Sequence, residues 1–99
     1  MMHLSVDVHC HWSENPPSYR IYLNDDMLTE RIFRWPGYQN YIKEHIIVET
    51  TPGIHILRIE NCSSWGTFKL DNLIVEDKPA VIHPNYPDPS GQKLTFISN

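Results

Sequence analysis

The stretch from Ser18 to Glu60 most strongly constrains the fold, because short apolar runs alternate along it with tight-turn signals. These signals are Asn24-Asp25-Asp26, Trp35-Pro36-Gly37 and Pro52-Gly53. Asn, Asp and Gly accept left-handed backbone conformations, and proline fixes φ near a value that turns require. Apolar runs separated by such turns are typical of antiparallel strands. The stretch therefore predicts an antiparallel sheet.

The rest of the chain continues this pattern of strands and turns. Apolar side chains share one parity of residues 3–12, and a period of two is the spacing of one strand face. Poor alternation in the third strand predicts a bulge there. The fold class that follows is all-β, an antiparallel β-sandwich or jelly roll of about seven to eight strands. The predicted strands are residues 3–12, 19–23, 27–34, 40–50, 54–60, 67–76, 80–83 and 93–98.

Length and composition limit the organisation of the protein. Its 99 residues predict a single domain over 1–99, with a proline-rich surface connection at 83–92 and a closing strand at 93–98. A formal net charge of −4 argues against a nucleic-acid-binding surface. The sequence has no apolar run long enough to predict a membrane span. The first residues lack a basic segment followed by an apolar one, so no secretory signal is predicted.

No motif in the sequence specifies a reaction. There is no nucleophile elbow, phosphate-binding loop or dinucleotide fingerprint. The chain is therefore predicted not to be an enzyme, and no catalytic residues are assigned.

His9 and His11 form a candidate metal site. Residues i and i+2 of a strand point the same way, so both imidazoles share a face with Asp7. A zinc site needs three or four ligands, so the fold would have to bring in another. The pair also titrates near neutral pH, which would suit a pH-sensitive interface. The alternative is that both are ordinary exposed residues on a solvated sheet face.

Asp25 and Asp26 form a second candidate metal site, in a predicted turn. Oxygen ligands in a turn suit calcium. The spacing lacks the glycine and the terminal glutamate of an EF-hand loop, so the turn is not of that type. The alternative is plain turn chemistry, in which these side chains bond their own backbone.

Loop aromatics form the third candidate site, for a ligand. The residues are Trp35, Tyr38, Tyr41 and Trp65. Tyr and Trp in loops stack on sugar rings or anchor a protein partner. The alternative is that the tryptophans close the ends of the sandwich.

Cys10 and Cys62 are the two cysteines of the chain. Two cysteines permit one disulfide but do not make a disulfide-rich scaffold. The position of Cys10 on the apolar face of its strand favours a buried free thiol. The sequence leaves open whether the two residues pair.

Five segments between Tyr19 and Glu76 resemble parts of known small β-sandwiches. In order, they are I-Y-L-N-D-D-M-L, E-R-I-F-R-W, Y-I-K-E-H-I-I-V-E, P-G-I-H-I-L-R-I-E-N and F-K-L-D-N-L-I-V-E. They resemble non-catalytic carbohydrate-binding modules, particularly the calcium-assisted xylan-binding type. They are also similar to short virion proteins of tailed phages that share this sandwich. The resemblance implies that loop acids such as Asp25 and Asp26 would carry calcium and that loop aromatics would meet a glycan.

These observations lead to three functional hypotheses. The first is a virion structural or decoration protein that contacts other subunits of an assembly, located on the virion. The second is a free-standing carbohydrate-binding module that recognises a polysaccharide through loop aromatics, assisted by calcium. The third is a metal- or pH-responsive binding protein that uses His9 and His11. Expected partners are protein subunits, a glycan or further copies of the chain, but not nucleic acid or a membrane.

Overall fold

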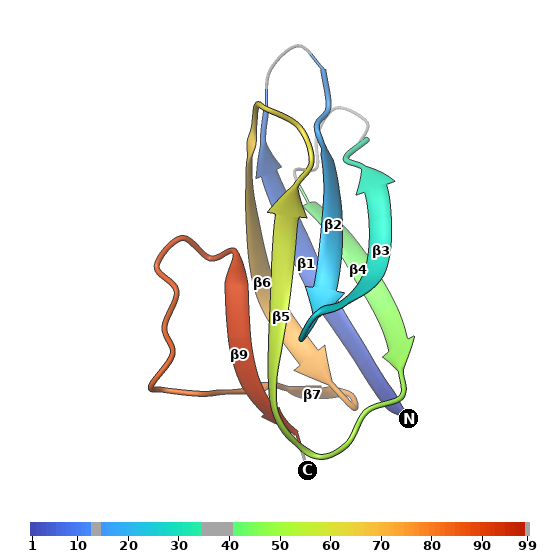
Figure 1. Ribbon diagram of the computed structural model, residues 1–99, viewed down its shortest axis with the longest axis vertical. Helices are drawn as coiled ribbons and strands as arrows, with labels where there is room; N and C mark the ends of the chain where they lie inside the picture. Colours follow the sequence, from blue (N-terminus) through green and yellow to red (C-terminus); the bar gives the residue numbers. More distant parts are fainter. Residues whose placement is uncertain (13–14, 35–40, 99) are drawn as a thin grey trace.

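The computed structural model describes residues 1–12, 15–34 and 41–98, which form nine strands and no helix. The strands make two antiparallel sheets packed as a sandwich, so the predicted fold class is confirmed (Figure 1). Sheet A has the strand order β4-β1-β6-β7, and sheet B has the order β3-β2-β5-β9-β8. The strands are β1 Met2–His11, β2 Ser18–Leu23, β3 Asp26–Ile32, β4 Tyr41–Val48, β5 Gly53–Asn61, β6 Thr67–Val75, β7 Lys78–Pro79, β8 Val81–Ile82 and β9 Lys93–Ser98.

Most strand predictions are confirmed within a residue or two. The closing strand has the predicted bounds, and β5 lies in the middle of sheet B, as its nearly continuous apolar run indicated. The placement of Trp12 on the first strand was wrong, because β1 ends at His11 and the Trp12 side chain is exposed. The two-residue strand β7 was not predicted, since it is too short to show a period and contains Pro79.

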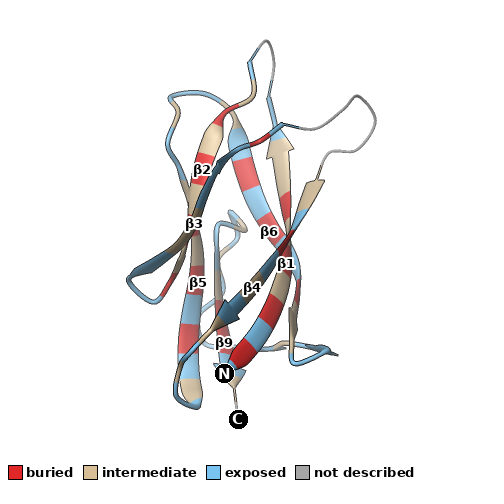
Figure 2. Ribbon diagram, turned by 90° about the vertical axis from the view of Figure 1, so that its right-hand side faces the viewer, coloured by how far each residue is buried: buried red, intermediate tan, exposed pale blue. Residues whose placement is uncertain are grey.

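The core lies between the inner faces of the two sheets. Buried residues alternate with more exposed ones along β1, β5 and β6, which is the pattern of strands with one face covered (Figure 2). Three aromatic rings meet near the start of β2 and β6: Tyr19 lies 5.2 Å from Phe68 and 6.5 Å from Phe33, measured between ring centroids. The aliphatic part of the core is Leu4, Val6, Val8, Ile21, Leu23, Leu57, Ile59, Leu70 and Leu73.

Two irregularities interrupt the otherwise regular pairing. The β2–β3 register shifts between Ile21 and Tyr22, which confirms the bulge predicted for the third strand. The β1–β6 register shifts between Ser5 and Asp7, opposite Asn72, whose φ is 52°. Asn accepts this left-handed conformation more readily than most residues. In the sequence, Asp71 and Asn72 interrupt the alternation of apolar residues at this same point.

The proline-rich segment 83–92 folds back on the sandwich and joins its two sheets. The Leu70 amide of β6 donates to the Gly91 carbonyl at 2.7 Å, and the Ile59 amide of β5 donates to the Gln92 carbonyl at 3.0 Å. The segment turns at Asp88, whose carboxylate accepts the Ser90 hydroxyl at 2.8 Å. This hydrogen bond lowers the pKa of the Asp88 carboxyl. Its final residues therefore link β6 of sheet A to β5 of sheet B.

Candidate functional site

An exposed aliphatic row crosses the outer face of sheet B. The pairing register aligns Ile54 of β5 with Ile97 of β9, and Ile97 with Val81 of β8. Their exposed fractions are 57%, 38% and 62%. Ile56 lies two residues from Ile54 on the same face and is also exposed. We call these four residues the aliphatic row.

A pocket of about 500 Å³ opens beside the aliphatic row and shares Val81 and Ile97 with it. Met2, Val75 and Ala80 add apolar walls, whereas Glu76 and Lys78 contribute one charge of each sign. In a pocket of this kind, the apolar walls bind an apolar group of the ligand, and the few polar groups fix its orientation. Row and pocket together form a continuous surface that can receive apolar side chains.

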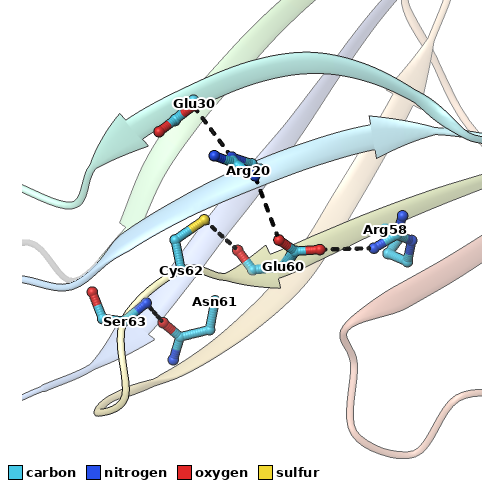
Figure 3. Close-up of polar contacts among 7 residues, drawn as sticks. All are labelled: Arg20, Glu30, Arg58, Glu60, Asn61, Cys62 and Ser63. Atoms are coloured by element: carbon cyan, nitrogen blue, oxygen red, sulfur yellow. Dashed lines mark hydrogen bonds and ion pairs between the residues drawn. The ribbon is translucent and has the colours of Figure 1, made fainter.

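A network of charges covers the other half of the same face (Figure 3). Arg20 of β2 lies between two carboxylates, 3.2 Å from Glu30 and 3.9 Å from Glu60. Glu60 also lies 3.5 Å from Arg58. The Arg58 guanidinium stacks over the Tyr22 ring, 4.1 Å from its centroid. The outer face of sheet B thus has an aliphatic half and a charged half.

Glu44 is a buried acid that the sequence analysis did not single out. Its side chain on β4 is 3% exposed, and its carboxylate accepts the Tyr19 hydroxyl at 2.6 Å. Arg31 of β3 lies 2.5 Å from the same carboxylate. Burial, and then the hydrogen bond to Glu44, raise the pKa of Tyr19 above its ordinary value. The network joins the two sheets, and the position of Glu44 on the apolar parity of its strand was the available signal.

His55 is a second buried polar residue, which the sequence offered only as a possible further ligand for the His9 and His11 site. Its Nε2 lies 2.9 Å from the Thr51 carbonyl oxygen, and its Nδ1 lies 3.3 Å from the Asn24 side-chain amide. These partners suit a neutral ring with the proton on Nε2, because the carbonyl can only accept and the amide can donate. Asn24 also accepts the Ile56 amide at 3.0 Å, so the group fixes the β2–β3 turn against β5. Its role is therefore structural.

The predicted histidine site lies on the outer face of sheet A. His9 stacks against Tyr41 with ring centroids 5.5 Å apart, and its Nε2 lies 4.0 Å from an Asp71 oxygen. Asp7 instead lies 2.9 Å from Lys43. His11 is exposed at the end of β1. Within residues 1–12, 15–34 and 41–98, no three His, Cys, Asp or Glu side chains gather closely enough to hold a metal ion.

The predicted acids and aromatics occupy different parts of the molecule. Asp25 and Asp26 are exposed at the β2–β3 turn, whereas Trp65 lies in the β5–β6 loop, toward the opposite end of the sandwich (Figure 1). Tyr41 begins β4 and is half-buried. Two predicted aromatics, Trp35 and Tyr38, lie outside the described residues.

The Trp65 loop is held by specific hydrogen bonds. The Trp65 indole N–H donates to the Asn15 carbonyl at 2.9 Å, and the Asn61 amide donates to the Trp65 carbonyl at 3.0 Å. The side chain is nevertheless 46% exposed. His11 pairs with Thr67, so the next residue, Trp12, leaves the sheet beside this loop. Two partly exposed indoles therefore lie on neighbouring segments.

Both cysteines are free thiols. Cys10 packs half-buried against the core, as the sequence predicted, and burial raises its pKa to about 11. Cys62 is exposed, with its sulfur 3.9 Å from the Glu60 carbonyl oxygen (Figure 3).

A scan of protein-family models and searches of curated proteins and of solved structures found no match for this chain. Among the described residues, no helix is long and apolar enough to cross a membrane.

Proposed function

We propose that this protein is a non-enzymatic structural subunit that attaches to a larger protein assembly through the outer face of sheet B. A virion decoration protein is the form of this role that the sequence resemblance suggests. The observation that carries the proposal is the aliphatic row: Ile54, Ile97 and Val81 lie side by side and exposed.

The aliphatic row supports protein contact because neighbouring exposed aliphatic side chains gain free energy when a partner covers them. Covering one such side chain fully contributes roughly 1.5–3 kcal/mol. Exposed apolar residues that stand singly need no explanation, but a contiguous group bordered by polar residues marks an interaction site. The adjoining pocket would receive an apolar side chain of the partner.

The charged half supports the same proposal by supplying orientation. Arg20 and Arg58 alternate in space with Glu30 and Glu60 across three strands. Charges of both signs at the border of an apolar contact fix its register and exclude wrong partners more than they add affinity. An aliphatic half beside a charged half would therefore dock in one orientation.

Gradient sedimentation of extracts from cells that make the protein tests this proposal. We expect the wild-type chain to move with particles far heavier than its own 11.6 kDa. The double variant Ile54→Lys/Val81→Lys should stay at the top of the gradient, because it buries two charges in the contact. Tyr86→Lys is the matched control, since it introduces the same charge at an exposed residue outside the face. A wild-type chain that sediments as an 11.6-kDa species would contradict the proposal.

The two indoles support a second candidate function, carbohydrate recognition at the loop end. Trp65 is exposed, yet its loop is fixed by hydrogen bonds from its own indole and from Asn61. A rigid exposed ring can stack on a sugar without losing much conformational freedom on binding.

Tryptophan fluorescence during titration with soluble xylan tests carbohydrate recognition. A saturable shift that Trp65→Ala removes would support this function, with Ile54→Ala as a control that leaves the loop intact. An unchanged spectrum with xylan and with a panel of other glycans would exclude it.

A further inference from the structure

The outer edges of the two sheets differ in how well they are protected against further strand pairing. Strands β4 and β7 border sheet A, and β3 and β8 border sheet B. An unpaired edge offers its backbone amides and carbonyls to any extended chain, and proteins usually protect it with short strands, prolines or bulges. Strands β7 and β8 have two residues each, and β7 contains Pro79. The β2–β3 register shift interrupts β3.

Strand β4 lacks these three protections, and the charges that it does carry are Lys43, which pairs with Asp7, and the inward Glu44, which pairs with Arg31. It runs for eight residues without proline and pairs with β1 in an unbroken register from Tyr41 to Val48. Within the described part of the chain, β4 pairs with β1 alone. In Figure 1 it lies at the outer edge of its sheet. It is therefore the one long, regular edge among the strands the structure describes.

The inner side chains of β4 are also incompletely covered. Ile42, Ile46 and Val48 are partly buried, whereas the residues opposite them on β1 are at most 5% exposed; these are Val8, Leu4 and Met2. A further strand beside β4 would cover Ile42, Ile46 and Val48 as β4 covers β1. The edge thus has both unpaired backbone and apolar area to bury.

We infer that β4 pairs antiparallel with β4 of a second copy of this chain, which joins two A sheets into one continuous sheet. A twofold axis perpendicular to the sheet pairs residues of equal parity. An axis at Ile46 sets Ile46 opposite Ile46 of the second copy, and Lys43 opposite Glu49 of the second copy. Lys43 of β4 and Glu49, the first residue after β4, are exposed and opposite in charge.

Two neighbouring registers, with the axis at Glu44 or at His45, lack this complementarity. An axis at Glu44 brings two buried carboxylates together, which repel each other, and it sets Lys43 opposite His45. An axis at His45 sets Lys43 opposite Ile47, so its charge meets no opposite charge on the second copy. The register at Ile46 therefore matches charges at its ends and apolar side chains at its centre. Opposite charges on directly facing strand residues stabilise pairing, whereas like charges oppose it.

This inference does not depend on the aliphatic row, which lies in the other sheet. Sedimentation of the purified protein over a dilution series tests it. We expect a reversible monomer–dimer equilibrium, because one strand from each copy buries a modest area. Glu49→Lys should weaken dimerisation about tenfold, since both symmetry-related charge pairs become repulsive.

A mixing experiment separates the charge pairing from any effect on folding. Lys43→Glu chains should dimerise weakly alone, but should pair with Glu49→Lys chains, because every facing pair is then opposite in charge. Melting curves check that each variant folds, which matters for Lys43→Glu because Lys43 also pairs with Asp7. Hydrogen exchange gives a charge-independent readout: β4 amides should gain protection as concentration rises, and β3 amides should not. A chain that stays monomeric, or a dimer whose β4 amides gain no protection, would overturn the inference.

Discussion

Glu44 places a carboxylate on the apolar side of β4, between Arg31 and the Tyr19 hydroxyl. A buried charge is tolerated when hydrogen bonds and an opposite charge replace the water it has lost. Each partner comes from the opposite sheet, so the three side chains act as a polar cross-link at the edge where β3 and β4 lie.

Arg31→Leu should lower the free energy of unfolding by about 1–3 kcal/mol, because it leaves the Glu44 carboxylate buried without its opposite charge. The loss is smaller than for a fully buried pair. The Arg31 side chain is half-exposed, so in the variant water can reach the Glu44 carboxylate and replace part of the lost interaction. Denaturant titration measures the change. Arg20→Leu, which breaks an exposed pair, should cost less than about 1 kcal/mol. Equal losses of unfolding free energy in the two variants would contradict a stabilising role for the Arg31–Glu44 pair beyond that of an exposed ion pair.

Cys10 should make the fold sensitive to alkaline pH. Its pKa is about 11 in the folded protein, against an ordinary value of 9.0, so the unfolded chain releases this proton first. The stabilisation is complete below about pH 9 and is lost as pH rises toward 11. Melting temperatures should therefore fall less steeply over this range in Cys10→Ala than in the wild type. Burial also raises the pKa of the exposed Cys62, but less than that of Cys10, so Cys62→Ala should change the slope less.

At the scale of the elements, the segment 83–92 depends on a glycine. Gly91 has a φ of 74°, and a Cβ added there would lie 2.5 Å from the Lys69 Cγ. Its carbonyl accepts the Leu70 amide, so the segment cannot move away without losing a hydrogen bond to β6.

Gly91→Ala should destabilise the protein by more than about 1 kcal/mol, through left-handed strain and the clash with Lys69. Adding Lys69→Ala to the same chain should restore the stability lost through the clash but not the stability lost through the backbone strain. Gly53→Ala is the control for strain alone, because its φ is also positive but no atom lies within 4 Å of the added Cβ. Thermal unfolding of the four chains distinguishes the contributions. A double variant no more stable than Gly91→Ala would contradict the assigned clash.

The strands were predictable because their patterns are local. The period of two in 3–12 and the Pro52-Gly53 turn each depend on neighbouring residues. The first prediction held except at Trp12. The turn leads from β4 of sheet A to β5 of sheet B, so the single sheet predicted for Ser18–Glu60 was wrong for β4. The two short strands and the contacts of 83–92 depend on residues far apart in the sequence, so no local pattern reports them. The same holds for the candidate site. From its apolar run, Ile54 would be assigned to the core, and only the pairing with Ile97 and Val81 shows that it belongs to an exposed row.

At the scale of the whole molecule, stability should be unevenly distributed over the two sheets. Strands β1, β2 and β5 have a paired neighbour along both edges and contribute most of the buried side chains. Strands β7 and β8 form two residue pairs each. Regions with few buried contacts open at low free energy, without global unfolding.

Native-state hydrogen exchange should therefore be slowest in β1, β2 and β5, where the opening free energy approaches that of global unfolding. Amides of β7 and β8 should exchange fastest among the strands. Denaturant dependence distinguishes the two groups, because only global opening exposes enough surface to respond strongly. Protection of β8 equal to that of β5 would contradict this order.

The position of β1 at the centre of sheet A has a consequence for synthesis. Leu4 pairs with Val75, about seventy positions later in the chain. At typical elongation rates of about 5–20 residues per second, β1 waits roughly 4–14 s for its β6 partner to be made. Strands β2, β3 and β5 are complete by Asn61, so they can associate earlier. On the ribosome, strands β3, β2 and β5 of sheet B can therefore associate while β1 still lacks its β6 neighbour, and a holding chaperone would find its target in β1.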